Sequence, residues 1–340
     1  MRQALASCAA AALIGAAAAA TTPLALTDAQ RLALERSPQI AAYDATIAAM
    51  RDPAIAARYA READVAAAQK IATSVDIARD TALAWLDCHY VERMARIASA
   101  QLKSAQLEVD GSERMYWAGR SSQAEFYVAR SMLVLFEDKS SELAHRGRTA
   151  RIALKRWIGD AGDAPLAPPP NIDRIRLVPA GLEGDLARHP DVVRLEKEEE
   201  LAARNVRIAR ANGQSEHEIA VALAKRDEAR AARDEKLRAK AAETRIMIDE
   251  WQHARDRRDR YTREIVPLAH ERTLATLVAY RGGKATLAEV LAARRVETEA
   301  QMQSVEIERE VARMWTQLNF VVPETLPNPA PTASRKERAE

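Results

Sequence analysis

The feature that most constrains the fold is a long run of residues without a helix breaker. From Ala54 the chain contains neither glycine nor proline until Gly111, and the helical pattern continues through Trp117. About 60 residues at about 1.5 Å each form on the order of 90 Å of helix. No compact domain needs a helix of that length, so the run predicts an elongated, all-α protein.

The composition agrees with long packed helices. Aromatic residues make up 4% of the chain and charged residues 29%, and alanine is very abundant. This mixture supplies little material for two large globular cores but is typical of helices that pack along their length. Small residues such as Ala66, Ala82 and Ala105 let helix backbones approach closely, which predicts antiparallel coiled coils.

A 15-residue motif occurs twice. "YWAGRSSQAEFYVAR" spans Tyr116 to Arg130, and "YRGGKATLAEVLAAR" spans Tyr280 to Arg294, at an offset of 280 − 116 = 164 residues. The shared positions are Tyr116/Tyr280, Gly119/Gly283, Ala124/Ala288, Glu125/Glu289, Ala129/Ala293 and Arg130/Arg294. Because a helix commonly ends on glycine and the next begins on serine or threonine, each copy predicts the tip of a helical hairpin. The chain is therefore expected to be two tandem repeats with both tips at one end.

Helix breakers divide each repeat in the same way. In the first, a helix begins near Asp28 with Thr27 as N-cap, is interrupted at Pro38, and ends at the joint Arg51 to Pro53. The long helix and a return helix from Gln123 to Ile158 follow. The second repeat is predicted to have helices at Leu182 to Ala211, Glu216 to Tyr280 and Leu287 to Phe320, with a joint at Asn212 to Ser215.

The N-terminal segment predicts export. Arg2 precedes an apolar stretch from Ala4 to about Ala20, with small residues from Ala18 to Ala25, as in a secretory signal peptide; a membrane-spanning helix is the alternative. We therefore expect a signal peptide at 1–25, repeats at 26–158 and 182–322, a Pro/Gly-rich linker at 159–181, and a disordered tail at 323–340. Removal of the signal leaves Cys88 alone, which favours a buried structural thiol in an oxidising compartment.

This ordered set of features resembles the TolC family of outer-membrane efflux channels, and within it the CzcC-like heavy-metal branch. The resemblance rests on the two tips, on the internal repeat, and on the stretches "LALERSPQIAAYDA", "ARDTALAWLDCHYVER" and "VLAARRVETEAQMQ". It implies a homotrimer whose hairpins form a helical tunnel through the periplasm, exporting metal ions or small toxic compounds. Its partners are then a periplasmic adaptor at the tips and an inner-membrane pump.

The sequence departs from the family at the two joints. Family members carry membrane β-strands there, and such a strand needs about 9 to 11 residues. Arg51 to Pro53 and Asn212 to Ser215 are too short, so we expect the helical tunnel without its membrane strands. Outer-membrane location thus follows from the resemblance and periplasmic location from the missing strands. The alternative function is a non-transport periplasmic coiled-coil protein that binds an adaptor or a sibling channel.

The acids of the two tips are the main candidate functional residues. Glu125 and Glu289 stand where the family places an acid near the periplasmic aperture, so the resemblance implies a ring of six carboxylates in a trimer. Such a ring attracts cations and raises the pKa of some members through mutual repulsion. The alternative is a solvated first-turn acid that stabilises the helix dipole.

The neighbouring tip residues have simpler expected roles. Arg120 and Lys284 directly follow the glycines and either face the adaptor or pair with the tip acids. Gly119 and Gly283 serve the chain reversal, where a positive φ is needed.

Other functions find no support in the sequence. The six histidines are dispersed without a ligand-like spacing, so no metal site is predicted; they are His89, His145, His189, His217, His253 and His270. The sequence has no phosphate loop and no nucleophile elbow, so neither an enzyme nor a cofactor is expected. The stretch "KRDEARAARDEKLRAK" interleaves acids with bases, which favours a solvated coiled-coil face over nucleic-acid binding.

Overall fold

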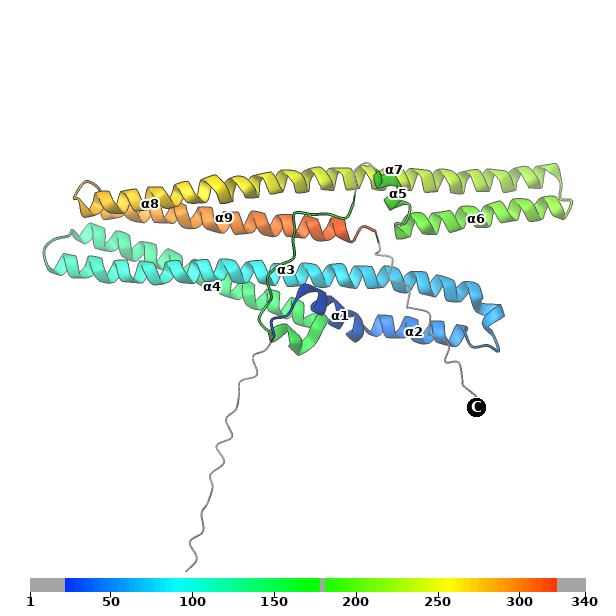
Figure 1. Ribbon diagram of the computed structural model, residues 1–340, viewed down its shortest axis with the longest axis horizontal. Coiled ribbons are helices and arrows are strands. Elements are labelled where there is room, and N and C mark those ends of the chain that lie inside the picture. Colours follow the sequence, from blue (N-terminus) through cyan, green and yellow to red (C-terminus); the bar gives the residue numbers. More distant parts are fainter. Residues whose placement is uncertain (1–21, 178–180, 323–340) are drawn as a thin grey trace, which may run out of the picture.

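The computed structural model describes residues 22–177 and 181–322, and these form an elongated all-α molecule (Figure 1). Within these ranges, strand-like pairing is limited to an isolated parallel β-bridge between Leu24 and Leu166. The predicted fold class is confirmed. Most of the predicted signal peptide at 1–25 and the predicted tail at 323–340 lie outside the described residues.

The first repeat consists of a short helix pair and a long hairpin. Its helices are α1 (Leu26–Arg36), α2 (Pro38–Met50), α3 (Ala56–Trp117) and α4 (Gln123–Ile158). The predicted long helix is confirmed, with 62 residues in α3. The prediction that Thr27 caps α1 is wrong, because the buried side chain of Leu26 already belongs to the helix and Ala25 takes the cap position.

The second repeat follows the same plan with one additional break. Its helices are α5 (Leu182–Leu186), α6 (Pro190–Ala211), α7 (Glu216–Arg260), α8 (Val266–Arg281) and α9 (Leu287–Asn319). The single helix predicted from Leu182 to Ala211 is two helices. Since the ring of Pro190 pushes the preceding residue out of the helical region, His189 has an extended backbone and separates α5 from α6.

A π-helical segment, Tyr261–Ile265, joins α7 to α8 within what the sequence predicted as one continuous helix. Pro267 accounts for it. Proline has no amide hydrogen and its ring collides with the carbonyl four residues earlier, so the chain widens by one residue before it. The corresponding residue of the first repeat, 164 positions earlier, is Lys103, and α3 continues through it as regular α-helix.

The two hairpin tips lie at the same end of the molecule, and the joints α2–α3 and α6–α7 lie at the opposite end (Figure 1). A tip cluster of apolar side chains links the two hairpins. Its buried members come from α3, α4 and α9; they are Ala105, Val109, Ala129, Leu133, Leu287 and Leu291. The tandem-repeat arrangement predicted from the 164-residue offset is therefore confirmed.

A larger core lies between the tips and the joints, where the linker crosses the helices. The backbone amide of Ala167 donates to the Leu24 carbonyl at 3.1 Å, and Trp315 Nε1 donates to the Arg174 carbonyl at 2.8 Å. Asp173 forms an ion pair with Arg258 of α7 at 2.7 Å. The linker thus acts as a strap that fastens the first repeat to α7 and α9.

None of the described helices contains a stretch long and apolar enough to span a membrane.

Candidate functional site at the helical tips

Each tip reverses the chain through the same glycine-dependent motif. At the first tip Gly119 has φ 69°, and at the second Gly283 has φ 70°. The amide of the residue after each glycine donates to a carbonyl five residues earlier, Arg120 to Met115 and Lys284 to Ala279, both at 2.8 Å. This is a Schellman motif, in which the positive φ favours glycine over any side chain.

The return helices begin with capping boxes that use the two tip acids. The amide of Glu125 donates to Ser122 Oγ at 3.2 Å, and the Glu125 carboxylate accepts from the Ser122 amide at 3.3 Å. In the second tip the Glu289 amide donates to Thr286 Oγ1 at 3.3 Å, and the carboxylate accepts from the Thr286 amide at 2.7 Å. The acids therefore have a local structural role, which the spacing Ser/Thr-x-x-Glu in the sequence could have indicated.

Most of the charged groups at the tips are exposed, and Glu125 is half-buried. Hydrogen bonds from the backbone and side chain of Thr286 hold the pKa of the Glu289 carboxyl below its usual value, so in the single chain this group is a carboxylate. Arg120 and Lys284 are exposed, and within the described residues neither forms an ion pair with Glu125 or Glu289. Of the two roles expected for these cations, pairing with the tip acids is not seen in the single chain.

Aromatic packing differs between the tips. Tyr116 stacks on Phe126 of the return helix with ring centroids 6.4 Å apart. The neighbouring Trp117 is 77% exposed. Tyr280 packs against the tip cluster. The first tip therefore presents an indole to solvent, and the second presents Arg281 at the corresponding position.

Ion pairs connect α3 to α9 along their length, and the sequence did not reveal them. Glu108 pairs with Arg294 near the tips at 2.6 Å, and Asp87 contacts Arg313 at 3.0 Å farther from them. Burial raises the pKa of the Glu108 carboxyl, and the Arg294 guanidinium opposes that rise. These pairs join residues about 200 positions apart, and no local pattern in the sequence indicates such partners.

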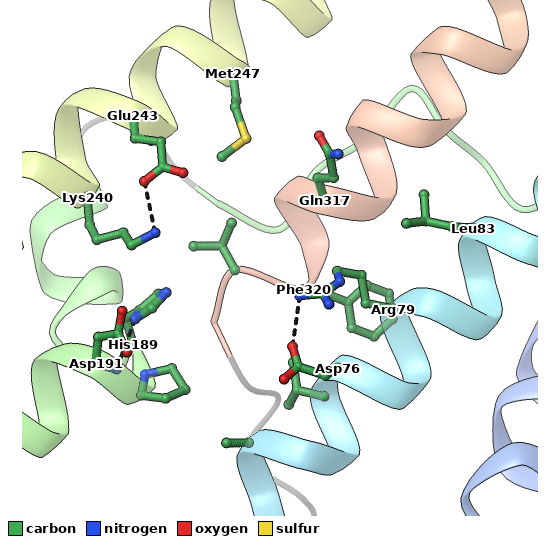
Figure 2. A pocket seen from close by; sticks show the side chains of 14 residues that line it. Asp76, Arg79, Leu83, His189, Asp191, Lys240, Glu243, Met247, Gln317 and Phe320 are labelled. Carbon is green, nitrogen blue, oxygen red and sulfur yellow. Dashed lines mark hydrogen bonds and ion pairs between the residues drawn. The ribbon is translucent and has the colours of Figure 1, made fainter.

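A cleft of about 640 Å³ lies between the repeats, beside the corner where α5 meets α6. Figure 2 shows its lining, which comes from α3, α6, α7 and the end of α9. The cations at its wall are paired within their own helices, Arg79 with Asp76 and Lys240 with Glu243, both at 2.8 Å. His189 faces this cleft, and its Nδ1 accepts a hydrogen bond from the Asp191 amide at 3.1 Å.

This capping role predicts acid sensitivity at His189. Burial lowers the pKa of the ring, Lys240 and Lys236 add to the decrease, and Asp191 and Glu243 oppose it. Because the unfolded chain then binds the proton more readily, the stabilisation is complete above about pH 6.5 and is lost as the pH falls toward the folded pKa. In melts followed by circular dichroism, we expect His189→Asn, which keeps a capping side chain, to lose less stability between about pH 7.5 and 5 than the parent. An identical loss in the two proteins contradicts the assignment.

Among the described residues, Cys88 and the histidines do not come together as a group of metal ligands. Within the described residues, no group of three or more His, Cys, Asp or Glu side chains is placed to hold a metal ion. Cys88 is buried and free. Burial raises the pKa of its thiol to about 12, and Glu92 adds to that rise, so the group is an unreactive thiol at neutral pH.

Comparison by sequence finds no match to a protein-family model and none to a curated protein. Comparison by structure finds bacterial outer-membrane proteins. The outer-membrane protein VceC of Vibrio cholerae shares 16% identity over 87% of this chain and 95% of its own, with a TM-score of 0.70. CusC, studied for transmembrane channel formation, shares 13% identity over 90% of this chain and 94% of its own, with a TM-score of 0.73. The outer-membrane channel MtrE of Neisseria gonorrhoeae shares 13% identity over 87% of this chain and 88% of its own, with a TM-score of 0.68.

The paired helical hairpins with both tips at one end therefore define a class of fold that this chain shares with bacterial outer-membrane channels. Within that class, the chain has the TolC-type fold. The resemblance found in the sequence is confirmed at the level of the fold.

Proposed function

We propose that this chain is the channel component of a tripartite efflux system, exporting metal ions or small toxic compounds through a trimeric helical tunnel. The observation that best supports this proposal is the pair of long hairpins with both tips at one end (Figure 1). The same arrangement is shared with outer-membrane channels over about nine-tenths of the chain.

Assembly with further copies agrees with the apolar side chains that the hairpins leave exposed. Tyr127, Val134 and Leu135 lie on the face of α4 opposite the tip cluster, and Leu268 and Val278 are exposed on α8. A ring of hairpins covers both faces, since each hairpin then has a neighbour on two sides. Removal of this apolar surface from water favours association.

In such a ring the tips of three chains meet at one end. Glu125 and Glu289 then contribute six carboxylates around the opening, and Arg120 and Lys284 are available to a periplasmic adaptor. Carboxylates close together at a constriction attract cations and repel anions. The exposed indole of Trp117 is a further apolar contact point at the same end.

The test separates the charge of the tip acids from their role as helix caps. Glutamine can replace glutamate in a capping box, so Glu125→Gln with Glu289→Gln removes the charge and keeps the cap. We expect this double variant to reduce export of divalent cations and cationic dyes, while helix content is unchanged. The measurement is accumulation of those solutes in cells whose resistance depends on this chain.

Glu218 provides a matched control, because it forms the same capping box with Ser215 at the opposite end of the molecule. Glu218→Gln is expected to leave export unchanged. Normal export by the tip variant contradicts the aperture role of the acids. If deletion of the whole chain leaves solute accumulation unchanged, although the purified chain captures an adaptor, the transport proposal is wrong.

A further inference from the structure

The end of α6 farthest from the tips combines exposed apolar residues with a surplus of positive charge. Between Leu201 and Ser215 the sequence contains three arginines and neither aspartate nor glutamate. Val206 and Ala209 are buried against α7. Leu201 and Ile208 are 54% and 49% exposed on the other side of the helix.

Helical spacing places the exposed residues in one stripe. Leu201, Arg204 and Ile208 follow each other at intervals of three and four residues, so they share the face that points away from α7. Arg207 borders this face and is also exposed. We call these four residues the outer stripe of α6.

Within the part of the chain that the structure describes, the arginines of the outer stripe are unpaired, whereas the cations nearer the start of α6 are paired. Arg194 pairs with Glu198, and Lys197 pairs with Glu200 at 2.9 Å. Among the described residues, Arg204 and Arg207 have no carboxylate partner. The positive charge of the outer stripe is therefore available to an external anion.

The joint of the first repeat, at the same end of the molecule (Figure 1), also exposes aliphatic side chains, although its three arginines between positions 51 and 65 are matched in the sequence by three acids. Ile55 and Val65 of the α2–α3 region are 41% and 57% exposed. Arg51 is exposed and, within the described part of the chain, forms no ion pair. Both joints thus present arginine together with large aliphatic side chains.

We infer that this end of the molecule binds an anionic phospholipid surface peripherally, with the outer stripe of α6 as its main contact. Arginines meet the phosphate headgroups, and Leu201 and Ile208 enter the boundary between headgroups and acyl chains. A nucleic acid would use the arginines but leave these two aliphatic side chains in water. A convex helix face suits a lipid surface, which adapts to the shape of what it binds. The inference does not depend on the transport proposal.

The test measures binding of the purified full chain to sedimented vesicles. Vesicles of phosphatidylcholine alone are compared with vesicles in which part of it is replaced by phosphatidylglycerol. We expect binding to the anionic vesicles, weakened between about 0.1 M and 1 M salt because screening reduces the attraction. Each arginine near an anionic surface is worth about a fivefold change in affinity, so Arg204→Gln with Arg207→Gln is expected to reduce binding roughly 25-fold.

The control removes the same amount of charge from the same helix. Arg194→Gln with Lys197→Gln lowers the net charge equally but affects residues that are already paired, so binding is expected to stay within about twofold of the parent. An equal loss in both double variants shows that only net charge matters and overturns the proposal. Equal binding to neutral vesicles, or no binding to either kind, also overturns it. A further variant, Leu201→Ser with Ile208→Ser, tests whether the outer stripe is a contact between copies of the chain. If this variant changes the oligomer mass but still binds vesicles, the proposal is overturned.

Discussion

Trp85→Ala is expected to lower the free energy of unfolding by about 3 to 5 kcal/mol, the range for removal of a large buried aromatic side chain. Trp85 is fully buried in the main core. Its Nε1 donates to the Leu24 carbonyl at 3.1 Å, and its ring stacks on His89 with centroids 5.5 Å apart. The substitution therefore leaves a cavity and also removes the hydrogen-bond donor that holds the first described residues against α3.

Urea denaturation followed by circular dichroism at 222 nm, where helix dominates, measures this loss. Trp117→Ala is the matched control, because the same side chain is removed from a site that is 77% exposed. We expect the control to stay within about 0.5 kcal/mol of the parent. Trp85→Phe, which keeps an aromatic ring but not the donor, is expected to fall between the two. A Trp85→Ala protein within 1 kcal/mol of the parent contradicts the position of the core.

The sequence predicted the helices well where periodicity and helix breakers agree. The return helix Gln123–Ile158 was placed at its observed bounds, since a serine cap and a following glycine mark its ends. The predicted helices were wrong where a single proline interrupts a sequence that is otherwise helical in pattern. Pro267 stands inside a strongly helical pattern, and the chain accommodates it by a local π-helical turn and not by a break.

The linker shows why tertiary packing is harder to predict. Its Pro and Gly content predicts a segment without a long helix, but nothing local indicates that Asp173 meets Arg258 or that Arg174 accepts a hydrogen bond from Trp315. These contacts depend on the arrangement of the two repeats. They hold the linker against helices of the second hairpin, whereas the sequence pattern predicts the two repeats as separate units.

The candidate site shows a similar division. The repeated motif located the tips and the reversal at Gly119 and Gly283. It did not distinguish an acid that lines an aperture from an acid that caps a helix, because Glu125 and Glu289 satisfy both patterns. The structure adds the capping hydrogen bonds, and the role of the charge in an assembly stays a prediction.

Comparison of the repeats shows one core position at which they differ in chemistry. Leu133 of α4 belongs to the tip cluster, and the residue 164 positions later is Glu297 of α9. Glu297 is also only 8% exposed. Its carboxylate contacts His270 Nδ1 at 2.7 Å, and the first repeat has Gln106 at the position of that histidine. A buried carboxylate in the second hairpin thus replaces an aliphatic side chain of the first.

Exchanging these residues between the repeats is expected to change stability in opposite directions. Glu297→Leu is expected to raise the free energy of unfolding by about 1 kcal/mol, because burying a carboxylate costs free energy that an apolar side chain of similar volume does not cost. His270 is half exposed and can return to water without its partner. Leu133→Glu is expected to cost about 3 to 5 kcal/mol, since it loses apolar burial and places a carboxylate within the apolar tip cluster.

Urea denaturation of the two single variants and the parent gives both values under the same conditions. Glu297→Ala is the control for the first variant, because it removes the carboxylate without supplying an apolar side chain of leucine's size, and it is expected to be less stable than Glu297→Leu. If Glu297→Leu proves less stable than the parent, the carboxylate and its hydrogen bonds stabilise the second hairpin more than leucine does in the first. If Glu297→Leu is more stable than the parent, the second hairpin retains a glutamate that is less favourable for folding than the leucine at the equivalent position of the first hairpin.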